Sequence, residues 1–323
     1  MSKKFNIFLS VLFCAFIGGV CVISLLLPDK NFSPLENRFL QKPPKLSAES
    51  LGSGKFMTDA EKYVSDHIVG RDFWVAMKAW SERLSGKKEN DGVYFGKQDT
   101  LINRVKDPEP SKLDQDMGYL DALIGNMSVP VYFGLIPSAA EIWKDRLPDG
   151  APTADEKAII DRLYFSTGAS TIDLYGALAP HSGEDIYYRT DHHWTSLGAF
   201  YGANAIFETM GLEPIDLNDY RKTTVTDQFN GTLFSSSGVR WLPPDSIDTY
   251  VPDEGVKVTS WFKGTPEEGS LYVDSYLDVK DKYSYFLGGN QALCVIETEH
   301  ADAPKVLVVR DSYSDSLAPF LTE

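Results

Sequence analysis

Residues 5–27 form an apolar run without a single charged side chain, and this run most constrains where the rest of the chain can fold. A helix of that length is long enough to cross the ~30 Å hydrocarbon core of a bilayer. Lys3 and Lys4 precede the run, and positive charge collects on the cytoplasmic flank of membrane spans. We therefore expect residues 1–27 to be a single-pass membrane anchor, with the C-terminal domain outside the cytoplasm.

A cleaved signal peptide is the alternative interpretation of this run. The apolar region of a signal peptide usually has about 7–15 residues and ends at a small-residue cleavage site. The run here is longer, and LLLPDK at 25–30 offers no such site. Both interpretations export the remainder of the chain.

The composition predicts a folded, acidic protein. Hydrophobic residues make up 43% and charged residues 24% of the chain, which is typical of a globular domain. The net charge is −15, from 46 acidic and 31 basic residues. An acidic surface repels phosphate backbones and anionic lipid headgroups. We therefore exclude nucleic acids as partners and expect neutral glycans, small acyl donors or proteins.

The segment after the apolar run predicts a tether followed by helices. Residues 28–54 contain four prolines among Ser, Lys and Gly, which is typical of a segment with little regular structure. From 55 to 84, apolar residues recur at helical spacing and predict two helices broken near Gly70. We expect the folded domain to occupy residues 55–323.

Apolar segments and helical segments then alternate along the chain. The predicted helices are 111–127, 153–166 and 195–210, and the predicted strands are 129–136, 171–174 and 305–309. Buried strands that alternate with helices favour a parallel sheet covered on both faces. Residues from about 220 to 300 are rich in Thr, Val, Tyr and Trp and are interrupted by Pro and Gly, which predicts an antiparallel β-rich insertion.

The chain ends at Glu323, one predicted helix after the strand at 305–309. Doubly wound sheets commonly continue beyond such a point. We therefore expect the C-terminus to be truncated, in a fragment or a shortened gene product.

The densest group of chemically active residues is YYRTDHHWTSLGA at 187–199, which precedes and opens a predicted helix. The helix dipole favours neutral imidazole at this end, and a general base must be neutral. In the spacing Asp191-x-His193, the carboxylate can hold one ring nitrogen while the other faces a substrate. The alternative, that Asp191 caps the helix and the histidines only pack beside it, stays open at this point.

A second group, VLVVRDSYSDSL at 306–317, places Asp311 and Ser312 directly after the predicted strand at 305–309. The carboxyl ends of parallel strands are where α/β sheets bind ligands, and the following turn can aim N–H groups at an oxyanion. A plain helix cap at this turn is again the alternative. The two groups together supply an acid, a base and a nucleophile, whose order along the chain differs among known triads.

The string Asp191-His192-His193 also permits a metal-site interpretation, as in manganese-dependent phosphoesterases. Adjacent histidines do not easily share one ion on a regular element, and further ligands would be needed. We therefore predict no metal and no cofactor, and we rank a metal-dependent phosphoesterase last among the functions considered.

TDHHWTSLGA at 190–199 resembles the signature after which the DHHW family is named. Five further segments resemble that family's pattern in the same order: FSPLENRFL at 32–40, YVSDHIVGRD at 63–72, NDGVYFGK at 90–97, FNGTLFSSSG at 229–238 and RDSYSDSLAPFL at 310–321. The family in turn resembles the SGNH-like domains of alginate O-acetylation proteins, which carry an Asp-x-His-Trp motif upstream of their serine. This resemblance implies an SGNH-like (flavodoxin-like) parallel sheet flanked by helices over residues 55–323.

Transferred to this sequence, the resemblance implies Asp191 as the orienting acid, His193 as the base and Ser312 as the nucleophile. Weaker candidates for substrate or oxyanion contacts are Tyr313, Asn230, Gly231 and Trp194. Arg310 stands where SGNH esterases have glycine before Asp-Ser, and the usual Asp-x-x-His near the C-terminus is replaced by Asp-x-His upstream.

The expected function is therefore a membrane-anchored, serine-dependent O-acyltransferase or esterase that acts on a cell-envelope or secreted polysaccharide. By analogy with alginate acetylation, the expected partner is a multi-spanning membrane-bound O-acyltransferase. The alternative is a non-catalytic glycan-binding or assembly protein, in which aromatic residues stack on sugars. The tryptophans considered for this role are Trp143, Trp194, Trp241 and Trp261.

Overall fold

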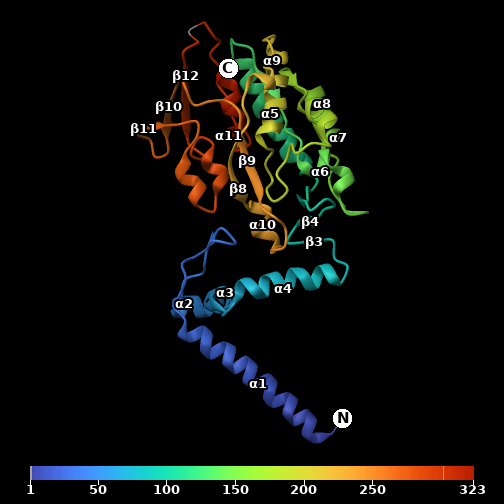
Figure 1. The fold of residues 1–323 in the computed structure, drawn as a ribbon, viewed down its shortest axis with the longest axis vertical. Coiled ribbons are helices and arrows are strands. Elements are labelled where there is room, and N and C mark those ends of the chain that lie inside the picture. Colours follow the sequence, from blue (N-terminus) through green and yellow to red (C-terminus); the bar gives the residue numbers. More distant parts are fainter. Residues whose placement is uncertain (1, 301) are drawn as a thin grey trace. The chain divides into compact units, whose positions relative to one another are not determined.

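The computed structural model describes residues 2–300 and 302–323 and divides into two compact units, Met1–Ser85 and Gly86–Glu323. Unit 1 carries the apolar helix and three further helices. Unit 2 carries both groups of candidate catalytic residues (Figure 1).

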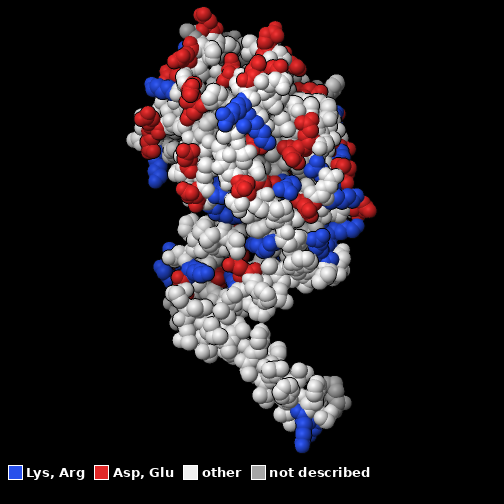
Figure 2. Space-filling view, viewed as in Figure 1, with Lys and Arg blue, Asp and Glu red and all other residues white. Residues whose placement is uncertain are grey.

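The helices and strands of unit 1 are α1 (Lys3–Leu26), β1 (Phe32–Ser33), β2 (Arg38–Phe39), α2 (Ala48–Gly52), α3 (Lys55–His67) and α4 (Arg71–Leu84). Helix α1 coincides with the predicted apolar run, and its length and composition suit a membrane span or a signal sequence. Its surface is uncharged beyond the lysines of its first turn (Figure 2). The predicted break near Gly70 is confirmed: this residue has φ 68, a left-handed conformation that favours glycine.

Charged side chains tie the β1–β2 hairpin to α3 within unit 1. Arg38 donates to both carboxylate oxygens of Asp66, with Nη–Oδ distances of 3.0 and 2.5 Å, and its Nε donates to Glu36 at 2.6 Å. The Gln41 N–H also donates to Asp66, at 2.8 Å. Burial alone would raise the pKa of Asp66, but the hydrogen bonds from Arg38 and Gln41 hold this pKa below its ordinary value. The expected tether at 28–54 therefore includes a hairpin held by a buried carboxylate.

Among its described residues, unit 2 contains ten strands, seven α-helices and six short 3-10 helices, labelled η1 to η6. In chain order they are β3 (Glu89–Asn90), β4 (Val93–Phe95), β5 (Leu101–Asn103), α5 (Pro110–Asn126), β6 (Tyr132–Gly134), α6 (Ala139–Ile142), η1 (Lys144–Arg146), α7 (Glu156–Ser166), β7 (Ser170–Ile172), α8 (Leu174–Leu178), η2 (Ala179–His181), α9 (Ser196–Met210), η3 (Leu217–Asp219), β8 (Thr223–Phe229), α10 (Thr232–Ser237), β9 (Asp245–Thr249), β10 (Val256–Trp261), β11 (Pro266–Gly269), η4 (Asp274–Asp278), η5 (Lys282–Tyr285), β12 (Leu293–Thr298), α11 (Ser314–Leu317) and η6 (Ala318–Thr322).

The strands of unit 2 confirm a mixed α/β fold. Strand β6 pairs parallel with β7, with Phe133 opposite Thr171, as expected for alternating strands and helices. The predicted β-rich insertion is also confirmed, since β8 pairs antiparallel with β9, and β10 lies between β11 and β12 in an antiparallel sheet. In Figure 1 strands β10, β11 and β12 lie on one side of unit 2 and helices α6, α7 and α8 on the other. Within the described residues the parallel pairing stops at two strands, so a single large parallel sheet is not confirmed.

The prediction of a buried parallel strand at 305–309 is wrong. The segment forms no strand, and its side chains are exposed, from 43% at Val308 to 89% at Val309. A buried strand needs a hydrogen-bonded neighbour and cover on both faces. Among the described residues, β6 and β7 pair only with each other and do not extend to this segment. The apolar pattern indicated an extended segment, but it contained no information on which strand would pair with that segment.

The hairpin network of unit 1 yields a stability prediction. Asp66→Ala removes the acceptor of Arg38 and of the Gln41 N–H, which we expect to cost about 2 kcal/mol locally. Hydrogen exchange of the Gln41 amide in the full chain should then accelerate by about 30-fold. Asp59→Ala, which removes only a surface ion pair with Lys55, is the matched control and should leave this exchange unchanged. Equal protection in Asp66→Ala and wild type would contradict the role of the network.

Candidate active site

The loop that carries Asp191 and His193 is closed by backbone hydrogen bonds on both sides. Tyr187 and Trp194 form an antiparallel bridge, and the Thr195 N–H donates to the Ile186 carbonyl at 2.9 Å. Helix α9 begins one residue later with Thr195 as its cap, so the predicted helix at 195–210 is confirmed to within a residue. These backbone hydrogen bonds hold the two ends of the loop together.

Asp245, the first residue of β9, holds the same loop from the insertion. Its carboxylate accepts from the Thr190 N–H at 2.8 Å, from Thr190 Oγ1 at 2.6 Å and from Arg189 Nε at 3.1 Å. Burial raises the pKa of Asp245, while these donors oppose the rise. No sequence motif indicated a role for this residue, because it lies more than fifty positions after the loop.

Trp194 connects the loop to the turn that carries Ser312, residues 311–315, which we call the serine turn. Its side chain is fully buried, and its indole N–H donates to the Tyr313 carbonyl at 2.9 Å. The Trp194 side chain packs against two glycines of α9, Gly198 and Gly202. A Cβ atom at Gly202 would lie only 2.8 Å from the ring, and a Cβ atom at Gly198 would lie 2.3 Å from the Ile186 carbonyl oxygen. The small residues of α9 thus set the position of Trp194.

Asp191, His193 and Ser312 form a continuous hydrogen-bonded row. Nδ1 of His193 lies 2.6 Å from Asp191 Oδ1, and Nε2 lies 2.8 Å from Ser312 Oγ, although Ser312 is 119 residues further along the chain. A carboxylate only accepts, so Nδ1 carries the proton and Nε2 accepts from the serine hydroxyl. Asp191 and His193 are buried, and Ser312 is partly exposed.

Both carboxylate oxygens of Asp191 have partners. Oδ1 accepts from the ring and the backbone N–H of His193, and Oδ2 accepts from the Thr232 N–H at 2.7 Å and from Thr232 Oγ1 at 2.9 Å. Burial would raise the pKa of Asp191, but the hydrogen bond and charge of His193, with the Thr232 N–H, hold it well below its ordinary value. Asp191 therefore stays ionised at neutral and mildly acidic pH, as an orienting acid requires.

Tyr283 is a component of the site that the sequence did not predict. Its ring stacks on the imidazole of His193, with centroids 3.8 Å apart and planes 9° apart, and its hydroxyl donates to the Ser312 carbonyl at 3.0 Å. It is buried and lies in the 3-10 helix η5 of the β-rich insertion. A lone tyrosine among sixteen, distant from both motifs, gives no sequence signal.

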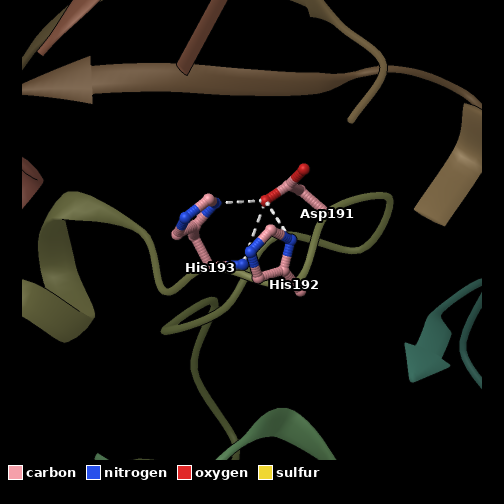
Figure 3. A group of neighbouring side chains, drawn as sticks. All are labelled: Asp191, His192 and His193. Carbon is pink, nitrogen blue, oxygen red and sulfur yellow. Dashed lines mark hydrogen bonds and ion pairs between the residues drawn. The ribbon is translucent and has the colours of Figure 1, made fainter. Parts of the chain in front are cut away.

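The two adjacent histidines have different hydrogen-bond partners in the structure. His192 Nδ1 lies 2.8 Å from Thr232 Oγ1, and 3.5 Å from Asp191 Oδ1, whereas His193 contacts Ser312. Figure 3 shows both rings beside the Asp191 carboxylate, and the possible ligand atoms of the three residues lie within 4.8 Å of one another. A metal ion there would have to displace the partners of Asp191 and His193, so the donor set favours a hydrogen-bonded row.

The weaker candidates have varied surroundings. Tyr313 donates its hydroxyl to the His192 carbonyl, and burial raises its pKa. The Gly231 N–H donates to Thr190 Oγ1 at 3.0 Å and so is engaged within the protein, and a Cβ at Gly231 would stand 2.3 Å from Asp191 Cβ. The side-chain oxygen of Asn230 is buried without a partner among the described residues. Trp194 and Trp143 are fully buried, which leaves neither ring face free for a sugar.

The serine turn is held by its own neighbours. The Asp315 N–H donates to the Ser312 carbonyl at 3.1 Å, and Asp311 accepts from the Tyr313 N–H at 3.0 Å, so Asp311 organises the turn. Arg310 pairs with the buried Asp315 and donates to Gln291 Oε1 at 3.0 Å. Burial raises the pKa of Asp315 to about 6 against the opposing charge of Arg310. Arg310 thus connects the turn to the insertion.

Gly198 and Gly202, the glycines of α9 that pack against Trp194, allow a second stability prediction. Gly198→Ala forces a methyl group against the Ile186 carbonyl, and we expect a loss of about 1–3 kcal/mol in the free energy of unfolding. Gly118→Ala on α5, where a Cβ meets nothing within 4 Å, should instead stabilise by up to about 1 kcal/mol. Urea unfolding of both variants measures the difference, and similar values for the two would contradict this packing.

Solved structures resemble this fold. A DHHW family protein from Eubacterium siraeum is 25% identical, with 71% of this chain and 81% of that chain covered and a TM-score of 0.61. Bacillus cereus PatB1 is 22% identical, with 69% and 82% covered and a TM-score of 0.56. The O-acetyltransferase domain of Pseudomonas putida AlgJ is 19% identical, with 51% and 67% covered and a TM-score of 0.38. No curated protein sequence matches the chain.

A family model described as DHHW protein matches residues 117–323. This region is more than half of the chain and includes Asp191, His193 and Ser312. The resemblance predicted from the sequence motifs is therefore confirmed, and the chain belongs to the DHHW family.

Proposed function

We propose that this chain is an extracytoplasmic, membrane-anchored, serine-dependent O-acyltransferase or esterase that acts on a cell-envelope or secreted polysaccharide. The observation that supports this most strongly is the row of hydrogen bonds from Asp191 through His193 to the hydroxyl of Ser312. A buried acid, an oriented imidazole and a partly exposed serine are the parts of an activated nucleophile.

The proposed reaction has two half-steps. Ser312 Oγ attacks the carbonyl of an ester donor while its proton passes to His193 Nε2, and the charge of Asp191 stabilises the resulting imidazolium. The donor's alcohol leaves with that proton, and an acyl group remains on Ser312. A sugar hydroxyl then attacks this ester, gives its proton to His193 and receives the acyl group, and Ser312 regains its proton. Water in place of the sugar gives hydrolysis.

The comparisons support the choice of probe. PatB1, which shares the fold, is described in one structure with a sulfonyl adduct, at 20% identity and a TM-score of 0.55. This likeness concerns the fold alone, and we extend it to an SGNH-like arrangement of the core as part of the proposal. It makes a sulfonylating or phosphonylating reagent the natural test of Ser312.

The location follows from α1 (Lys3–Leu26), which we propose as an uncleaved anchor with the catalytic unit outside the cytoplasm. Acyl transfer outside the cell needs an exported acyl donor. We propose a multi-spanning membrane-bound O-acyltransferase as the partner that supplies it, and crosslinking in membranes tests that pairing.

Covalent labelling tests the nucleophile. The full chain treated with a fluorophosphonate should gain one adduct mass, and Ser312→Ala should gain none, because the attacking oxygen is absent. His193→Ala should label at least about 100-fold more slowly, since it lacks the base. Ser314→Ala, in the same turn, is the matched control and should label like wild type.

Two outcomes would contradict the proposal. A folded wild-type chain that gains no adduct, while binding polysaccharide, would favour the non-catalytic glycan-binding alternative. A stoichiometric metal ion bound through Asp191 and His193 would favour the metal-dependent phosphoesterase.

Tyr283 is proposed as a positioning residue, because its ring restrains His193 and its hydroxyl restrains the Ser312 backbone. An aromatic stack is worth about 1 kcal/mol, so Tyr283→Leu should slow fluorophosphonate labelling by about 3–10-fold. Tyr283→Phe keeps the ring and should recover most of that rate. Labelling rates per folded molecule separate positioning from stability, and a Phe variant as slow as the Leu variant would exclude the ring as the cause.

A further inference from the structure

His192 takes no part in the proposed attack of Ser312 on the donor, although it lies beside the residues that do. Its ring lies on the imidazole of His193, with centroids 3.9 Å apart and planes 37° apart. The hydroxyl of Tyr313 donates to the His192 carbonyl and so restrains its backbone. The His192 side chain is 38% exposed, against 7% for His193, so a ligand can reach the ring of His192.

The hydrogen bonds of Thr232 determine which ring nitrogen of His192 carries the proton. Thr232 Oγ1 has a single hydrogen, which it donates to Asp191 Oδ2 at 2.9 Å, because a carboxylate only accepts. The same oxygen lies 2.8 Å from His192 Nδ1, so Nδ1 is the donor in that contact. In the neutral ring the proton is therefore on Nδ1, and Nε2 carries a lone pair.

Nε2 of His192 has no hydrogen-bond partner among residues 2–300 and 302–323, which the structure describes. Burial lowers the pKa of His192 against the opposing charge of Asp191, so the ring is neutral at pH 7. A neutral ring that donates through Nδ1 can only accept through Nε2. The site thus has a second hydrogen-bond acceptor, which suits a hydroxyl group of a ligand.

The two imidazole rings face the same carboxylate. Nδ1 of His193 lies 2.6 Å from Asp191 Oδ1, and Nδ1 of His192 lies 3.5 Å from the same oxygen, as Figure 3 shows. Because the ring centroids are only 3.9 Å apart, the two Nε2 atoms are neighbours. Their separation is comparable with that of neighbouring hydroxyl groups on one sugar. Nε2 of His193 faces Ser312, and Nε2 of His192 is the acceptor beside it.

We propose that His192 Nε2 binds a hydroxyl group of the acyl acceptor, next to the hydroxyl that receives the acyl group. In the second half-step, one hydroxyl gives its proton to His193 Nε2 as it attacks the ester on Ser312. The neighbouring hydroxyl donates a hydrogen bond to His192 Nε2 and keeps its own proton, so it only holds the acceptor in place. The acceptor class that fits this pair is a neutral vicinal diol, which sugars contain.

This inference rests on the proposed acyl-enzyme and adds a source of specificity to it. A site that is built to bind a hydroxyl group discriminates against molecules that lack this group. Water and simple alcohols have no second hydroxyl group to donate to His192. The contact therefore favours transfer to a sugar over hydrolysis.

Competition between two matched acceptors tests the proposal in the full chain. Ser312 is acetylated with p-nitrophenyl acetate, and 1,2-propanediol and 1-propanol, which differ by one hydroxyl group, compete for the acetyl group. His192→Asn keeps an amide donor near the Nδ1 position for Thr232 but has no atom at the Nε2 position. It should lower the ratio of diol ester to propyl ester by about 3–10-fold, because one hydrogen bond is lost.

His192→Gln is the matched variant, because its longer amide can place an acceptor oxygen near the Nε2 position. It should recover most of the wild-type product ratio. A change in stability or in the reactivity of Ser312 alters the yield of both esters together, so the ratio reports the acceptor contact alone. ¹⁵N NMR of labelled histidine gives a second readout, in which the His192 proton should be on Nδ1.

Each contrary outcome has a different meaning. Equal ester ratios in wild type and His192→Asn would overturn the acceptor contact while leaving Ser312 as the nucleophile. A His192 proton on Nε2 would overturn it without any acceptor present. A wild-type chain that gains neither an acetyl nor a fluorophosphonate adduct would contradict the proposed function itself.

Discussion

The hydrogen bond between the Asp191 carboxylate and Nδ1 of His193 is the interaction on which the candidate site depends. It fixes the tautomer that leaves Nε2 free to accept from Ser312, and it does so inside the protein, where a lost partner is costly. Thr232 completes the shell of the carboxylate, and glycine at 231 is what allows the chain to approach Asp191 so closely. Segment 229–238, which was identified in the sequence only by resemblance, therefore supplies hydrogen-bond donors to the Asp191 carboxylate.

Two features bring distant parts of the chain to this bond. Trp194, next to His193, packs on the glycines of α9 and bonds to the backbone beside Ser312, so one side chain positions both motifs. The β-rich insertion supplies Asp245 beneath the loop and Tyr283 against the imidazole. The insertion is thus part of the site, because without it neither the loop nor the ring would have these restraints.

Much of this arrangement could be predicted from the sequence, and the limits have physical causes. The helices of residues 55–84, α5, α7 and α9 carry strong apolar periodicity or caps, and their predicted ranges agree with the structure to within a few residues. The row of Asp191, His193 and Ser312 came from motif resemblance. Periodicity misled at 305–309, because an apolar run specifies neither a pairing partner nor cover. Asp245 and Tyr283 act through tertiary contacts with residues more than 25 positions away, which one sequence does not encode in a local pattern.

The hydrogen-bonded state of His193 can be measured directly in the full-length chain with ¹⁵N-labelled histidine. Proton NMR should show a far-downfield resonance from the proton on Nδ1 of His193. This resonance should disappear in Asp191→Asn. It should persist in His192→Gln, because the His192 ring bonds to Thr232 instead. A His193 ring protonated on Nε2 and bare at Nδ1 would contradict the account, since Nε2 could then not accept the proton of Ser312.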